Sequence, residues 1–89
     1  MRSAFDIYNE INSDKEKEKK YRNMMAHQEQ VITNAIKYDG DIHGSRLFIF
    51  SDRGYFNGAQ RDWYEEFYNK AKKEMEDAGY RIVGICVCW

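Results

Sequence analysis

The sequence reads RLFIF at residues 46–50 and YRIVGICVCW at residues 80–89, with the amphipathic stretch QRDWYEEFYNKAKKEMEDAG at residues 60–79 between them. This order predicts a strand, a helix and a second strand. Neither apolar run alternates with polar residues, so we expect both faces of each strand to be covered, as in α/β packing. Two strands make an incomplete sheet, which the first half of the chain or a second copy of the protein must complete or cover.

The first forty residues are helical by composition and period. A charged run, DKEKEKK at residues 14–20, interrupts their apolar seam. Ser13 and Glu16 match a capping box, which favours two helices with a break near Asn12 over one helix of ~54 Å. The second helix is expected to end at Asp39 and Gly40, where a glycine adopts the left-handed cap conformation. The seam residues are Ala4, Ile7, Ile11, Tyr21, Met25, Ile32 and Ala35.

These patterns predict an α+β or α/β fold. Its helical N-terminal half, of one or two helices, packs on a small sheet built from the strand–helix–strand unit. With 89 residues, no proline and no linker, the chain is expected to be a single domain, helical over 1–40 and strand–helix–strand over 46–89.

The charge balance of 14 basic and 15 acidic residues gives a net charge of -1, which provides no bulk attraction to nucleic acid or anionic membranes. Glu16 and Glu18 interleave with the lysines of the charged run, which argues against direct nucleic-acid binding and favours a solvated helix face. No apolar stretch has the length of a signal peptide or a membrane span, and Cys86 and Cys88 are badly placed for a mutual disulfide. We therefore expect a cytoplasmic protein without membrane association.

Aromatic residues are unusually frequent, with seven Tyr, five Phe and two Trp. A stripe at helical spacing on the C-terminal helix is expected to pack on the sheet: Tyr64, Phe67, Tyr68, Ala71, Met75 and Ala78. Tyr55, Phe56 and Trp63 lie outside this stripe or at its edge, flanked by Arg53 and Arg61. Because Tyr, Trp and Arg are the usual anchors of protein interfaces, these five residues are the candidate partner-binding surface. The alternative is that Tyr55 and Phe56 fold back as a lid over the end of the sheet.

The segment Ser51–Arg61 follows a predicted strand and precedes a helix, where α/β folds commonly bind anions. Gly54 and Gly58 match neither the dinucleotide fingerprint nor a P-loop. An alternative function is therefore a small-molecule or nucleotide-phosphate binding module, with Arg53 and Arg61 paired to phosphate oxygens. A turn and a helix cap explain the same residues without a ligand.

The sequence contains no recognisable catalytic or metal-binding motif. His27, His43, Cys86 and Cys88 are the residue types of a zinc site, but nothing in their spacing brings them together. Neither histidine has a companion Ser, Cys or Asp at an interpretable spacing. We expect no enzymatic activity, no metal and no cofactor.

The favoured hypothesis is an interaction protein that acts by covering the surface of a partner. The partner is an unidentified host protein or protein–nucleic acid complex. The composition, rich in Asn, Lys, Ile and Tyr, is typical of AT-rich bacterial and phage genomes and indicates a phage or mobile-element inhibitor of a host defence or nucleic-acid enzyme, comparable in role to anti-CRISPR proteins.

A symmetric homodimer is also expected, through a continued sheet or through the N-terminal helices. The strand that ends at Trp89 has no charge after Arg81 to discourage pairing with another chain. Ile7 and Ile11 lie across the charged run from the rest of the core. The expected interface residues are Ile7, Ile11 and Val87; the alternative is a monomer whose first helix doubles back over the sheet.

Overall fold

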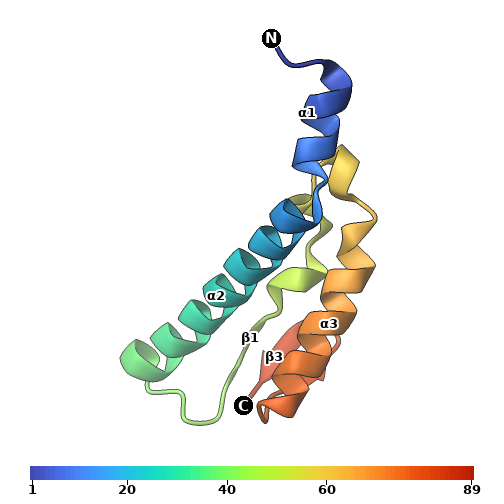
Figure 1. The fold of residues 1–89 in the computed structure, drawn as a ribbon. Helices are drawn as coiled ribbons and strands as arrows, with labels where there is room; N and C mark the ends of the chain where they lie inside the picture. The colour runs from blue at the N-terminus through green and yellow to red at the C-terminus, as the bar shows by residue number, and fades with distance from the viewer.

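The computed structural model describes all 89 residues, and it has the predicted architecture of a helical N-terminal half packed on a small sheet (Figure 1). Three short 3-10 turns connect the first strand to the last helix. The helices are α1 (Ala4–Ile11), α2 (Asp14–Asp39) and α3 (Trp63–Asp77). The strands are β1 (Ser45–Leu47), β2 (Arg81–Val83) and β3 (Cys86–Cys88), and the turns are η1 (Ile49–Ser51), η2 (Arg53–Tyr55) and η3 (Gly58–Gln60).

The helical half consists of two helices because a capping serine starts each one. Ser3 Oγ accepts the backbone N–H of Asp6 at 3.1 Å, and Ser13 Oγ accepts that of Glu16 at 3.3 Å. Such bonds satisfy backbone donors that the first turn of a helix leaves unpaired. α2 ends at Gly40, whose φ of 73° is the left-handed conformation that glycine adopts without strain. The predicted break and the predicted end of the second helix are both confirmed.

The sheet has the strand order β1-β3-β2, and both pairs are antiparallel. The run at residues 80–89 is therefore a hairpin, so its prediction as a single strand was wrong. Gly84, with a φ of 59°, allows the tight reversal between β2 and β3. β3 occupies the centre of the sheet, and both of its edges are paired.

Only one face of the sheet is covered, contrary to the expectation for both apolar runs. Val87 is fully buried on the inner face, whereas Leu47 and Val83 on the other face are exposed. The run at residues 46–50 stays extended only as far as Phe48 and then turns into η1. Its apolar character reflects this bend, because the bend adds Ile49 and Phe50 to the core beside Phe48, the last extended residue.

Tyr21, a fully buried residue, connects α2, η1 and α3 in the core. The ring of Tyr21, on α2, lies 5.8 Å from that of Phe50 in η1 and 5.4 Å from that of Phe67 on α3. Its hydroxyl donates to Glu74 Oε2 at 2.5 Å. Burial raises the pKa of Tyr21 well above its ordinary value, and the bond to Glu74 adds to the effect. Tyr21 is therefore a neutral hydrogen-bond donor inside the core.

The charged run does not form a purely solvated face, because several of its side chains pair with α3. These contacts are Lys17–Glu66 at 2.5 Å, Glu18–Lys70 at 3.3 Å and, just beyond the run, Arg22–Glu74 at 3.2 Å. All of them are at least partly exposed, so water screens each pair and its contribution to stability is small. Their main effect is to align α2 with α3.

Gln28 is the one fully buried polar side chain, and it ties α2 to the point where the chain leaves the sheet. Its Nε2 donates to the backbone oxygen of Leu47 at 3.2 Å, and its Oε1 accepts the backbone N–H of Ile49 at 2.9 Å. One amide thus satisfies both a backbone acceptor and a backbone donor at the bend into η1. Without it, two buried polar groups would lack partners.

Replacing Gln28 with Leu is expected to lower the free energy of unfolding by about 1–3 kcal/mol, because the backbone N–H of Ile49 loses its partner inside the core. Urea unfolding measures the change. Gln30→Leu, at an exposed position of the same helix, is the matched control and should change stability by no more than about 0.5 kcal/mol. Equal effects of the two substitutions would contradict this role of Gln28.

Candidate functional site

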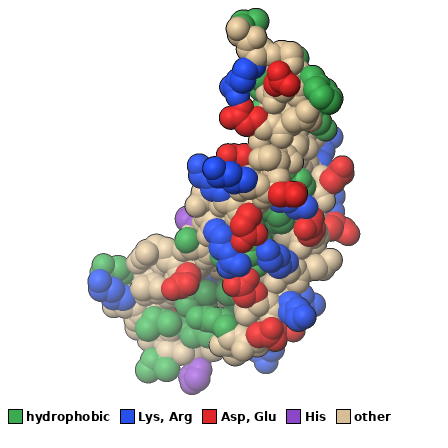
Figure 2. All heavy atoms as spheres, viewed as in Figure 1, with side chains coloured by type: hydrophobic (Ala, Val, Ile, Leu, Met, Phe, Trp, Pro, Cys, Tyr) green, Lys and Arg blue, Asp and Glu red, His purple; other side chains and the backbone are tan.

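α1 is an amphipathic helix without a single buried residue. Phe5 is 71% exposed and Tyr8 is 55% exposed, and Ile7 and Ile11 are exposed beside them. The helix projects from the body of the molecule, and Figure 2 shows its hydrophobic side chains open to solvent at the top of the view. The molecule measures 52 × 23 × 21 Å, with a radius of gyration of 15.4 Å against about 12 Å for a compact chain of this length.

Two of the five residues predicted to bind a partner lie in the core instead. Phe56 and Trp63 are buried, and their ring centres lie 5.5 and 5.8 Å from that of Phe67. Phe56 therefore behaves as the alternative lid residue, folded inward by the turns that precede α3. Arg53, Tyr55 and Arg61 remain exposed.

Arg53 and Arg61 line a common cavity of about 590 Å³, together with Tyr64 and Glu65. The guanidinium of Arg53 lies 4.7 Å from the ring centre of Tyr64, which holds it by a cation–π contact. Neither arginine takes part in an ion pair within the chain. The cavity thus presents two unpaired positive charges and one carboxylate to solvent.

Lys20 anchors this loop to α2, a role that its place in the charged run did not indicate. Its Nζ donates to the backbone oxygen of Tyr55 and, at 2.8 Å, to Gln60 Oε1. The same atom lies 5.0 Å from the ring centre of Phe56. Burial lowers the pKa of Lys20, as expected for a cation partly withdrawn from water.

These features gather at one end of the molecule. α1 precedes the start of α2, and Lys17 and Lys20 in the first turns of α2 contact α3 and the loop (Figure 1). We call α1 together with Arg53, Tyr55 and Arg61 the binding end. It combines an exposed apolar helix with exposed arginine and tyrosine side chains, a composition typical of protein interfaces.

Of the three residues predicted for a dimer interface, two are exposed and one is buried. Ile7 and Ile11 are exposed on α1 and are free to contact another molecule. Val87 is fully buried on the central strand, so its predicted interface role was wrong. A continued sheet through β3 is also excluded, because hydrogen bonds to β1 and β2 occupy both of its edges.

The residues considered for a metal site are spread over α2, the loop before β1 and β3. No three His, Cys, Asp or Glu side chains group closely enough to hold a metal ion. None of the helices combines the length and the apolar content needed to cross a membrane. No protein-family model matches the chain, and no curated protein or solved structure matches it.

Replacing Lys20 with Met is expected to speed amide hydrogen exchange in residues 53–60 by about tenfold or more, because a bond from a charged donor contributes roughly 1.5–3 kcal/mol. Hydrogen exchange followed by mass spectrometry measures the change. Lys19→Met, at the neighbouring exposed position, is the control and should leave exchange in the loop unchanged. Unchanged exchange in the Lys20 variant would contradict this anchoring role.

Proposed function

We propose that the protein is a protein-binding module whose binding end inserts α1 into an apolar groove of its partner. The observation that carries this proposal is that α1 has no buried residue although it carries Phe5, Ile7, Tyr8 and Ile11. Insertion of a short amphipathic helix into a groove is a recurrent mode of recognition. Full burial of each large apolar side chain contributes roughly 1.5–3 kcal/mol.

The length of α1 supports the same conclusion. Isolated helices shorter than about 12–15 residues are only marginally stable in water, and α1 has eight residues. Ser3 caps it and Ser13 starts the next helix, so its stabilisation within the chain is local. A partner that covers its apolar face therefore stabilises the helix and gains affinity from the same contact.

Arg53, Tyr55 and Arg61 extend the surface beyond α1. The two arginines have no acidic partner within the chain, which favours a partner that carries carboxylates around its apolar groove. Arg and Tyr side chains also supply much of the binding energy of known interfaces. Arg53 is already oriented by Tyr64, so ordering it costs less entropy on binding.

Composition and small size support a narrower form of the proposal. In this form the protein is a phage or mobile-element inhibitor that acts in the bacterial cytoplasm and covers the working surface of a host defence or nucleic-acid enzyme. Its mechanism is occlusion, in which a bound module excludes the natural substrate or subunit of the enzyme.

Affinity capture from a bacterial lysate, followed by mass spectrometry, is expected to recover a stoichiometric partner. The Phe5→Lys, Tyr8→Lys double variant should reduce capture at least tenfold, because it places two charges on the apolar face of α1. Leu47→Lys, which changes an exposed apolar residue on the outer sheet face, is the matched control and should capture normally. No stoichiometric partner, or equal capture by the α1 variant, would overturn the proposal.

A second candidate function is binding of a phosphate-bearing small molecule, and the shared cavity of Arg53 and Arg61 favours it. If it is correct, millimolar ATP or cyclic nucleotides should raise the melting temperature, and Arg53→Glu or Arg61→Glu should abolish the shift. Arg81→Glu changes an exposed arginine that is likewise outside any ion pair, and it should leave the shift in melting temperature unchanged. No shift with the unmodified protein would dismiss this candidate.

A further inference from the structure

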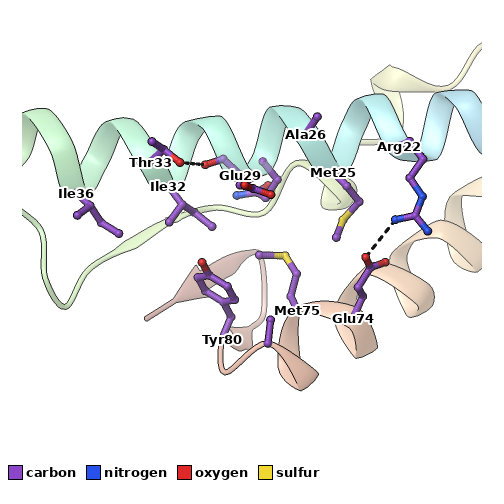
Figure 3. A pocket seen from close by; sticks show the side chains of 12 residues that line it. Arg22, Met25, Ala26, Glu29, Ile32, Thr33, Ile36, Glu74, Met75 and Tyr80 are labelled. Atoms are coloured by element: carbon purple, nitrogen blue, oxygen red, sulfur yellow. Dashed lines mark hydrogen bonds and ion pairs between the residues drawn. The ribbon is translucent and has the colours of Figure 1, made fainter.

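A groove of about 630 Å³ opens between α2 and α3 at the end of the molecule opposite α1. Figure 2 shows hydrophobic side chains gathered in it, and Figure 3 shows Met25, Ile32, Met75 and Tyr80 directed into the space between the two helices. Ile36, farther along α2, is 47% exposed. Arg22, paired with Glu74, closes one end of the groove. Ile32 and Met75 are buried at the floor of the groove, and Met25 and Tyr80 are half-buried, so Ile36 is its most exposed large apolar residue. Glu29 and Thr33 also line the groove.

The helix α1 of the same chain is too short and too tightly connected to cover this groove. Only Asn12 and Ser13 separate it from α2. Its eight residues span about 12 Å, whereas Met25 and Ile36 lie roughly 16 and 33 Å from the start of α2, at 1.5 Å per residue. If α1 doubled back, it would lie against the charged run and stop before the groove.

We propose that α1 of a second copy of this chain fills the groove and that the exchange is reciprocal. The molecule is 52 Å long, with α1 at one end and the groove towards the other. Two copies arranged antiparallel about a two-fold axis therefore place each α1 beside the groove of its partner. This arrangement closes with two copies and leaves no open surface for further growth.

The area available fits a reciprocal pair better than a contact between two α1 helices. Phe5 and Tyr8 are 71% and 55% exposed, so each ring can still bury the larger part of the ~150–250 Å² that full burial of an aromatic side chain removes from water. Two reciprocal contacts bury four such rings, together with Ile7, Ile11 and both grooves, which approaches the roughly 1,200 Å² of a small stable interface. Pairing α1 with its own counterpart would bury the same rings but would leave both grooves open.

The inference rests on the proposed function to the extent that both use the exposed face of α1. It adds the groove, which recognition of another protein does not use. Self-pairing and binding of another protein then compete for α1, so the dimer holds the apolar helix away from water until a partner displaces it.

Light scattering of the full chain at micromolar concentration tests the inference. The unmodified protein should have twice the 10.7 kDa mass of one chain. Phe5→Lys on α1 and Ile36→Lys in the groove should each give a single-chain mass, and Leu47→Lys on the outer sheet face should remain dimeric. An equal mixture of the Phe5 and Ile36 variants should have a higher average mass than either variant alone at the same concentration, because one of the two α1-to-groove contacts stays intact in the mixed pair.

Several results would overturn the inference. These are a single-chain mass for the unmodified protein, a dimeric Ile36→Lys variant, which would indicate pairing between the two α1 helices, or a mixture no heavier than either variant alone. Circular dichroism establishes that each variant is folded, and Ala78→Lys replaces Ile36→Lys if the latter unfolds, because Ala78 is an exposed groove residue. Ile36→Lys should still capture another protein through α1, so failure of the dimer and failure of the proposed function give different results.

Discussion

A single buried amide, that of Gln28, fixes where the chain leaves the sheet, and the remaining core follows from that position. Its two hydrogen bonds, to the backbone at Leu47 and Ile49, hold the bend into η1 against α2. The bend adds Ile49 to the core between Phe48 and Phe50, while Phe50 meets Tyr21 and α3 packs over them. A β-strand that continued straight would place Ile49 on the opposite face from the two rings.

This core contains no residue of α1. Lys17 and its neighbours in the charged run pair with α3, and Lys20 holds the loop that brings Phe56 over the end of the core. The loop and the ion pairs therefore already cover the side of α2 that follows α1. The apolar face of α1 is left exposed, as is the groove at the other end of the body. Partner binding and self-pairing are both proposed because these two surfaces are not covered within the chain.

The parts of this structure that the sequence predicted are those decided by local chemistry. Ser13 and Gly40 set the bounds of α2 by capping, and such signals lie within a few residues of the ends they determine. Gly84 was a local signal for the hairpin, but the apolar residues around it favoured one long strand. Gln28 and Lys20 could not be identified in advance, because their partners lie 19 to 40 residues away and only the folded chain brings them together.

α1 has no buried residue, so it should contribute nothing to the core of its own chain. Urea unfolding of a chain that lacks Met1–Ile11, measured at a concentration low enough to keep both proteins monomeric, tests it most directly. Asn12 and Ser13 are retained, so the cap of α2 stays intact. We expect the free energy of unfolding to stay within about 0.5 kcal/mol of that of the full chain, as for a change outside the core. A loss of about 2 kcal/mol or more would instead show that α1 packs against its own body.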